Sequence, residues 1–535
     1  MPKTLIILLL LLLSSTLHAQ TPSLEDLSLK EKIAQMFIVS VYGAPLNQSA
    51  LTLLQDLKPG GLVLLPSNIS DADGTARLIN QAQQAVQEVG GIPLFIAVDQ
   101  EGGIIARLKE GFTTFPVPML LTASGDDALA YAYGAALATE LKLVGVNMDL
   151  APVADLLTNR NNPIIGRRSF GSNPQWVGQT LSALISGMQS EGVLSIVKHF
   201  PGHGETHQDS HTALPVLDLD RERFETVEWI PFEAAIAADV SGMMLGHLVA
   251  PQLDPEALPA SLSPTIVNII RTDLSYDGLI MTDALDMDAI DTVYSPEEAS
   301  VQAILAGNDL ILLGAHVNPD SFYRAIDAVV LAVENGTISE AAIDQSVSRI
   351  LAAKQHYDLL NWQALSTPVE MPLEEHIIFI KKLFDQGVTL AKDEQHLIPI
   401  HPGESVGLVF PATQPKIAEV CKTWLPDLNL VGVSGSPSDT EIAWAAQMAA
   451  QVDKIIVFTI NADQDPNQQK LVRSLPPEKT IVVALWSAYD LESFPDISSY
   501  IVTYSPMQYA YESVCKGLSG DLIFNGRLAL DLADQ

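Results

Sequence analysis

The sequence has few cysteines and few basic residues. It contains two cysteines among 535 residues, Cys421 and Cys515, and no zinc or iron–sulfur spacing. In an exported protein they could form one disulfide or remain two buried thiols, and both readings stay open. Lysine and arginine number 29 against 64 aspartates and glutamates, a formal net charge of −35. The electrostatic field of this negative charge repels nucleic acid and anionic membranes, so neither is expected as a partner.

Long apolar runs are also missing, apart from one at the N-terminus. Lys3 precedes the apolar run Leu5–Leu13, and small residues follow up to Ala19. This order is typical of a secretory signal peptide, and the run is too short to span a bilayer, which needs about 20 residues. We expect residues 1–19 to be a signal peptide that exports the protein to the periplasm or the medium. We expect no stable membrane insertion after cleavage, and an uncleaved anchor is the alternative.

The remaining composition, 47% hydrophobic and 17% charged, is that of a globular protein. Short apolar segments alternate with longer amphipathic ones, which favours parallel strands joined by helical crossovers. The predicted helices are Asp71–Val89, Asp126–Leu143, Trp176–Glu191 and Arg221–Ala238. The eight predicted strands are Met36–Val41, Gly61–Leu65, Leu94–Val98, Val146–Leu150, Leu194–Val197, Met243–Leu245, Leu279–Met281 and Asp309–Leu313.

Ionisable residues lie just past the ends of several of these strands. Asp99 follows one strand, Lys198 and His199 follow another, and His247 and Asp283 follow two more. A (β/α)₈ barrel builds its active site from the carboxyl ends of many strands, whereas an open doubly wound sheet concentrates its site at one switch point. The pattern therefore favours an α/β protein with a (β/α)₈ TIM-type barrel, and the open sheet is the alternative.

A second domain is expected after the barrel. The alternation pauses at Leu-Ser-Thr-Pro and Met-Pro, and further apolar runs follow at 406–410, 455–460, 481–486 and 501–502. We predict a catalytic barrel over 20–360, a linker over 361–374 and a smaller α/β layered domain over 375–535.

The segment Lys198–His211 is unusually dense in ionisable side chains. Its glycines and proline exclude a regular helix or strand, so we expect a loop that leaves a strand end. Asp209 and His211 stand two residues apart, a spacing at which a carboxylate can hold an imidazole that transfers protons. A metal site is the alternative, although no other segment supplies an obvious set of ligands. An ordinary polar loop is the third reading.

Four separated motifs resemble glycoside hydrolase family 3, and more narrowly its β-N-acetylhexosaminidase branch. They are Asp99–Gly103 with Arg107, Ile165–Phe170, Lys198–His211 and Met281–Leu285. The resemblance covers roughly residues 24–357 and continues more weakly into the second domain. Ile104 stands where many relatives carry a basic residue. Glu205 replaces an aspartate that is common in the segment Lys198–His211, called the histidine loop below.

The resemblance implies a role for each matching residue. Asp283 resembles the nucleophile, and His211, held by Asp209, resembles the general acid/base. The positions that bind the terminal sugar are implied to be Asp99, Arg107, Arg168, Lys198, His199 and His247. Asp99 and Asp283 could instead cap helices, and Arg107 and Arg168 could form structural ion pairs. Glu101 is read as structural rather than catalytic.

The sequence thus predicts a retaining exo-β-N-acetylglucosaminidase that removes terminal N-acetylglucosamine from glycosides such as peptidoglycan or chitin fragments. We expect a carbohydrate substrate and neither cofactor nor metal. A family 3 β-glucosidase or β-xylosidase is the first alternative, and an N-acetylglucosaminide phosphorylase is the second. A catalytically inactive carbohydrate-binding protein is the alternative from another class, and a metal-dependent hydrolase is the last.

Overall fold

Eight short apolar segments form a parallel barrel in the first part of the chain. The computed structural model describes residues 23–210, 213–314 and 317–532. The strands pair in the order β10-β1-β2-β3-β6-β7-β8-β9, and a parallel bridge between Met281 and Leu310 joins the two ends. The barrel strands are β1 (Phe37–Ser40), β2 (Gly61–Val63), β3 (Phe95–Val98), β6 (Met148–Asp149), β7 (Leu194–Phe200), β8 (Gly242–Leu245), β9 (Leu279–Thr282) and β10 (Ile311–Leu312).

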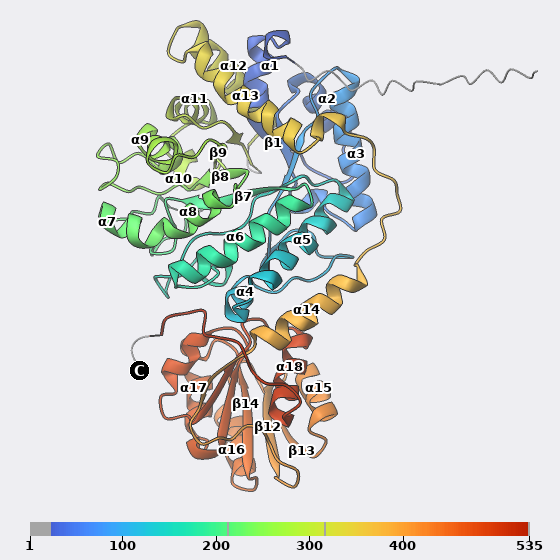
Figure 1. Ribbon diagram of the computed structural model, residues 1–535, viewed down its shortest axis with the longest axis vertical. Coiled ribbons are helices and arrows are strands. Elements are labelled where there is room, and N and C mark those ends of the chain that lie inside the picture. Colours follow the sequence, from blue (N-terminus) through green and yellow to red (C-terminus); the bar gives the residue numbers. More distant parts are fainter. Residues whose placement is uncertain (1–22, 211–212, 315–316, 533–535) are drawn as a thin grey trace, which may run out of the picture.

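Helices surround this barrel (Figure 1). They start and stop where the sequence supplies caps: the Asp71 side chain accepts a hydrogen bond from the Gly74 N–H at the start of α3, and Gly145 ends α5 with a φ of 94°. The helices are α1 (Leu29–Gln35), α2 (Gln48–Leu57), α3 (Ala72–Glu88), α4 (Met119–Ser124), α5 (Asp127–Val144), α6 (Pro174–Ser190), α7 (Arg221–Arg223), α8 (Ile230–Ala237), α9 (Pro264–Asn268), α10 (Asp288–Asp291), α11 (Pro296–Ala306), α12 (Pro319–Glu334) and α13 (Glu340–His356).

The helix predicted over Arg221–Ala238 is not continuous. Between α7 and α8 the chain forms a π-helical segment, Phe224–Glu228. Pro231 lies in the first turn of α8, where a residue without an N–H starts a helix but cannot continue one. The prediction of one regular helix was therefore wrong, because the chain leaves the α-helical pattern before Pro231 and a new helix starts there.

A mixed six-stranded sheet forms the second domain, in the order β11-β16-β15-β14-β12-β13, with β11 antiparallel to β16. The sequence did not predict β11 and β13, the two edge strands. Five of the six β13 residues are at least partly exposed, so this strand has no run of buried apolar side chains. The strands are β11 (Thr389–Asp393), β12 (Val406–Pro411), β13 (Leu428–Val433), β14 (Lys454–Thr459), β15 (Thr480–Ala484) and β16 (Ser499–Val502); the helices are α14 (Glu374–Gly387), α15 (Lys416–Trp424), α16 (Asp439–Ala449), α17 (Pro466–Arg473) and α18 (Gln508–Ser519).

A disulfide links Cys421 in α15 to Cys515 in α18, and both side chains are buried. This settles the question that the sequence left open. Among residues 23–532, outside the two short gaps, no helix is long and apolar enough to cross a membrane. The predicted signal peptide lies outside the described residues.

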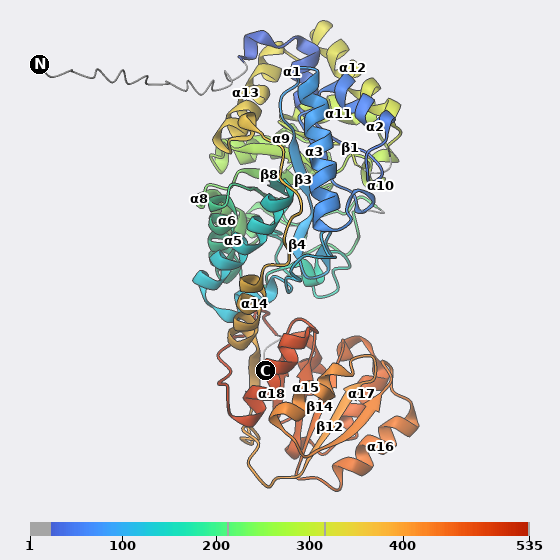
Figure 2. The ribbon, with the colours of Figure 1, turned by 90° about the vertical axis from the view of Figure 1, so that its right-hand side faces the viewer.

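The two domains lie end to end along the long axis of the molecule, with α4 and α14 at their junction (Figures 1 and 2). The Arg527 N–H donates to the Ala123 carbonyl at 2.8 Å, and its guanidinium lies 4.0 Å from the centre of the Trp176 ring. The C-terminal segment of the second domain is thereby attached to the barrel. The (β/α)₈ barrel followed by a smaller layered α/β domain is confirmed, while the domain limits 20–360 and 375–535 stay predictions.

Candidate active site

The predicted site residues lie at the carboxyl ends of the barrel strands. Asp99 directly follows β3 and Asp283 directly follows β9. Lys198 and His199 lie near the carboxyl end of the strand β7, and His247 follows β8 by two residues. Because the strands are parallel, all these positions are at one mouth of the barrel, where such folds hold their catalytic residues.

A network of buried ion pairs occupies this mouth. The Arg168 Nε and Nη2 atoms donate to the two Glu101 carboxylate oxygens, each at 2.8 Å, and Lys198 Nζ lies 2.8 Å from Glu101 Oε1. Lys198 Nζ also donates to Asp99 Oδ1 at 2.8 Å, and Arg107 Nη2 lies 3.7 Å from Asp99 Oδ2. The reading of Glu101 as structural agrees with these contacts, since it holds two cations of the predicted sugar-binding set.

Burial works to raise the pKa of the Asp99 and Glu101 carboxyls. The positive charge of Lys198 acts in the opposite direction, and with the neighbouring arginine charges it outweighs burial. Both pKa values therefore lie below their ordinary range. Since a buried carboxylate is costly without partners, the two carboxylates and the cations depend on one another. Asp99 is half-buried and keeps part of its carboxylate toward the mouth of the barrel.

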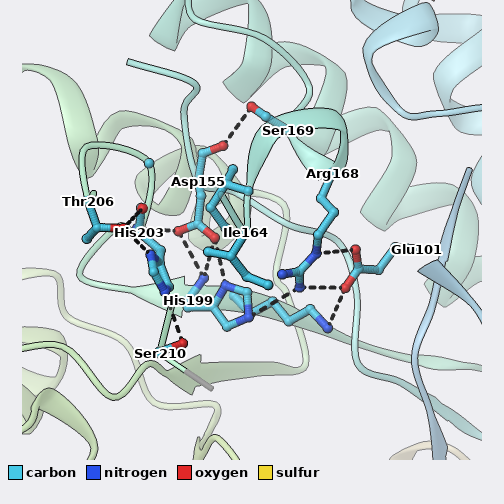
Figure 3. A network of polar contacts seen from close by, with 12 residues as sticks. Glu101, Asp155, Ile164, Arg168, Ser169, His199, His203, Thr206 and Ser210 are labelled. Atoms are coloured by element: carbon cyan, nitrogen blue, oxygen red, sulfur yellow. Dashed lines mark hydrogen bonds and ion pairs between the residues drawn. The ribbon is translucent and has the colours of Figure 1, made fainter. Parts of the chain in front are cut away.

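Asp155, which the sequence analysis did not single out, positions two histidines. His199 Nδ1 lies 2.7 Å from Asp155 Oδ2, and the His203 N–H donates to Asp155 Oδ1 at 2.6 Å. Figure 3 shows the Arg168 guanidinium between the Glu101 carboxylate and the His199 ring, with Asp155 on the other side of that ring. Asp155 is fully buried, six residues beyond β6, so periodicity gave no signal for it.

The His199 ring is held as a neutral imidazole. Burial lowers its pKa well below the ordinary value, and the nearby positive charge of Arg168 lowers it further. With Nδ1–H donating to Asp155, the Nε2 lone pair faces Arg168 Nη2 at 3.5 Å. His199 thus offers a fixed tautomer next to the buried cations.

Asp283 is held in its ionised form. Burial works to raise the pKa of this carboxyl, but the hydrogen bond from the Ala284 N–H, 2.8 Å from Oδ1, and the nearby positive charge of Lys198 act in the opposite direction, and the pKa lies below the usual value. His247 is buried between Ser261, whose Oγ lies 2.8 Å from Nδ1, and the Ala284 carbonyl, which lies 2.8 Å from Nε2. An ionised, half-buried carboxylate at the mouth of a barrel can act as a nucleophile.

The histidine loop packs tightly on the neighbouring segment after β6. Gly204 faces the Leu156 carbonyl so closely that a Cβ atom there would lie 1.5 Å from the oxygen. The Asn162 amide donates to the carbonyls of His203 and Gly204 at 2.8 and 3.0 Å. Asn162 was also missed from the sequence, because only the fold brings it beneath this loop.

The predicted acid/base pair is placed only in part. Asp209 is half-buried, and its carbonyl accepts a hydrogen bond from the Ala213 N–H at 3.1 Å. His211 lies outside the described residues. His203 forms contacts inside the loop, with Nδ1 2.8 Å from Thr206 Oγ1 and Nε2 3.1 Å from Ser210 Oγ. The structure thus gathers Asp99, Arg107, Arg168, Lys198, His199, His247 and Asp283 at one mouth.

Among the described residues, no cluster of three or more histidines, cysteines and carboxylates has the geometry to hold a metal ion. The side chains at the mouth are carboxylates, cations and imidazoles, which together suit a substrate rich in hydroxyl groups. A (β/α)₈ barrel with an ionised carboxylate among such groups defines a barrel enzyme that acts on a polar small molecule.

Comparison with known proteins assigns the family. Residues 28–353 match the model of the glycosyl hydrolase family 3 N-terminal domain, so the chain belongs to this family of enzymes. Over 94% of its length the chain is similar to 99% of a solved family 3 β-N-acetylglucosaminidase from Paenibacillus sp. str. FPU-7, with 32% identity and a TM-score of 0.83.

Curated relatives are similar to part of the chain. A β-hexosaminidase of Stenotrophomonas maltophilia is 32% identical over 60% of this chain and 96% of its own length. β-Hexosaminidase A of Pseudoalteromonas piscicida is 34% identical over 55% of this chain, and the chain spans only 53% of that relative.

Proposed function

We propose that the protein is a retaining exo-β-N-acetylglucosaminidase that releases terminal N-acetylglucosamine from glycosides such as peptidoglycan or chitin fragments. The observation that carries the proposal is the ionised Asp283 carboxylate beside the buried cations and the neutral His199 ring at the mouth of the barrel. The similarity to the Paenibacillus β-N-acetylglucosaminidase and the Stenotrophomonas β-hexosaminidase supports the choice of sugar.

In the proposed reaction, Asp283 attacks the anomeric carbon while the bond to the leaving-group oxygen breaks. An ionised carboxylate is needed for this step, and the lowered pKa of Asp283 supplies one at neutral pH. His211, held by Asp209, donates a proton to the leaving group and then removes a proton from the water that cleaves the glycosyl-enzyme. Configuration is retained because the anomeric carbon is inverted twice.

The terminal sugar is proposed to bind through the remaining residues of the mouth. Asp99 accepts hydrogen bonds from hydroxyl groups, while Lys198 and Arg168 donate to them. Glu101 and Asp155 contribute as positioning residues, since they hold Arg168 and His199 respectively. None of these steps requires a cofactor or a metal ion.

The test is hydrolysis of two chromogenic substrates, an aryl β-N-acetylglucosaminide and an aryl β-glucoside, by the wild type and by Asp283→Asn. We expect hydrolysis of the N-acetylglucosaminide and a loss of several orders of magnitude in the variant. Preference for the glucoside would assign the glucosidase branch, and product formation that requires phosphate would assign a phosphorylase. Binding without turnover would leave a carbohydrate-binding protein.

We also propose that the protein is exported and that residues 1–19 are removed. The buried Cys421–Cys515 disulfide supports this proposal, because such bonds persist in oxidising compartments. N-terminal sequencing of protein recovered from the periplasm and the medium tests it. A mature N-terminus near residue 20 is expected, and intact protein confined to the cytoplasm would contradict the proposal.

A further inference from the structure

A cavity of about 520 Å³ lies between the barrel and the second domain, a volume typical of small-ligand sites. Its barrel side includes Ile104, Asn161 and Arg167, and its second-domain side includes Asp463, Trp486 and Tyr489. None of the residues that we assign to the terminal sugar lines it. The cavity is therefore distinct from the sugar site, and its walls combine aromatic rings with amide and charged groups.

Arg167 is the unusual residue of this cavity. Its guanidinium carbon lies 4.2 Å from the centre of the Trp486 ring, so one face of the cation is stacked on an aromatic side chain. In the part of the chain that the structure describes, Arg167 forms neither an ion pair nor a side-chain hydrogen bond. Burial lowers its pKa because the cation has lost part of its hydration, and the negative charge of Asp463 acts in the opposite direction without outweighing burial.

The other charged groups of the cavity are engaged with one another. Arg160 forms an ion pair with Glu492 and lies 4.0 Å from Asp463, and it also stacks on Tyr489. Burial and the neighbouring Asp463 carboxylate raise the pKa of Asp490 to about 7. The Asp463 carboxylate is within ion-pair distance of Arg160, and its negative charge only partly offsets the effect of burial on the pKa of Arg167.

Two chain segments connect the cavity to the sugar site. Arg167 directly precedes Arg168, and Ile165 and Gly166 line the cavity as well. On the other side, Ile104 lies in the short hairpin of β4 (Gln100–Gly102) and β5 (Ile105–Ala106), between Asp99 and Arg107. Two segments that carry the proposed sugar contacts therefore also form the barrel wall of the cavity.

We propose that Arg167 and Trp486 form a leaving-group subsite that takes a carboxylate-bearing sugar attached to the terminal N-acetylglucosamine. This inference rests on the proposed function and deepens it. A guanidinium stacked on a ring presents its N–H edge, which matches the two oxygens of a carboxylate, and the indole ring packs against the sugar. The chain as a whole is strongly acidic, so such a substrate needs a local cation of this kind.

The test compares kcat/KM for N-acetylglucosaminyl-β-1,4-N-acetylmuramic acid and for the same disaccharide with its carboxyl converted to a carboxamide. The wild type is expected to prefer the acid by about 10- to 100-fold, the range for one charge-assisted hydrogen bond. Arg167→Gln should bring this ratio close to one, and Arg167→Lys should keep part of it. The kcat/KM for N-acetylglucosaminyl-β-1,4-glucuronic acid shows whether the subsite also accepts the carboxylate of a uronic acid, in place of the lactyl carboxylate of N-acetylmuramic acid.

Arg527→Gln is the matched control, because Arg527 also stacks on a tryptophan between the domains but does not line the cavity. This variant should keep the wild-type preference for the acid. Equal kcat/KM for acid and carboxamide in the wild type would overturn the proposal, and so would an unchanged ratio in Arg167→Gln. The wild-type ratio decides the question even if Arg167→Gln does not fold.

Failure of the proposed function is recognised separately, because it abolishes hydrolysis of the aryl N-acetylglucosaminide itself. In that event, titration calorimetry measures directly how tightly the protein binds N-acetylmuramic acid and its carboxamide. Tighter binding of the acid by the wild type than by Arg167→Gln is expected, and equal binding of the two ligands would overturn the subsite.

Discussion

Replacing Glu101 with glutamine should separate the structural from the functional part of the ion-pair network. The carboxylate is buried and contacts Arg168 through two hydrogen bonds and Lys198 through one ion pair. Glu101→Gln keeps the shape of the side chain but leaves two buried cations beside the single negative charge of Asp99. Removing one partner of a buried ion pair costs about 3 to 5 kcal/mol of unfolding free energy.

Activity should fall as well as stability. Arg168 and Lys198 are proposed to hydrogen-bond the terminal sugar, and each charge-assisted bond is worth about 1.5 to 3 kcal/mol. If both cations shift, kcat/KM for the aryl N-acetylglucosaminide should fall by about 100-fold or more. The assay is steady-state hydrolysis at a temperature where circular dichroism shows the variant folded.

Asp309→Asn provides the matched comparison. Asp309 is also fully buried and also holds two cations, Arg271 at 2.6 Å and Arg349 at 3.1 Å, but it precedes β10 and lies away from the proposed site. This variant should lose comparable stability while its folded fraction keeps its kcat/KM. If Glu101→Gln loses stability but keeps wild-type kcat/KM, Glu101 has no positioning role and the reasoning is refuted.

Two further predictions concern stability. Burial raises the pKa of Glu228 from 4.5 to about 7 in the folded protein. The folded state therefore binds this proton more tightly than the unfolded state does. The resulting stabilisation is complete below pH 4.5 and is lost as the pH rises through 7. Chemical unfolding should show Glu228→Gln more stable than the wild type by about 3 kcal/mol at pH 8 and nearly equal at pH 4, and no dependence of the difference on pH would contradict this. Cysteines 421 and 515 close a separation of 94 residues, so replacing both with serine should cost about 4 to 5 kcal/mol in unfolding free energy, and an unchanged denaturation midpoint would contradict the stabilising role.

The barrel and much of its mouth could be predicted from the sequence. The buried strands are continuous apolar runs, and the carboxyl end of each parallel strand is at the same mouth. Asp99, Lys198 and Asp283 directly follow or end such runs, so their meeting required only the fold class. The histidine loop was visible from its density of ionisable groups.

The supporting contacts could not be predicted in the same way. Asp155 reaches His199 and His203 only through the path of the loop after β6, which has no periodic signal. The stacking of Arg167 on Trp486 joins residues 319 positions apart in different domains. Such contacts depend on how the two domains pack, and a local pattern carries no information on that.

The two edge strands of the second domain were also missed from the sequence. Thr389–Asp393 and Leu428–Val433 are edge strands with exposed side chains, so hydrophobic burial, the main signal for a strand, is weak in both. The disulfide was likewise open to two readings, because spacing alone does not reveal which helices will lie side by side.

The most direct test of the central claim is to trap the covalent intermediate on Asp283. A 2,4-dinitrophenyl 5-fluoro-β-N-acetylglucosaminide keeps the first step fast through its leaving group, while the fluorine slows breakdown of the glycosyl-enzyme. Intact-protein mass spectrometry should show one added glycosyl group, and peptide mapping should place it on Asp283. A label on another carboxylate, such as Asp99 or Asp286, or rapid turnover without any label would contradict the account.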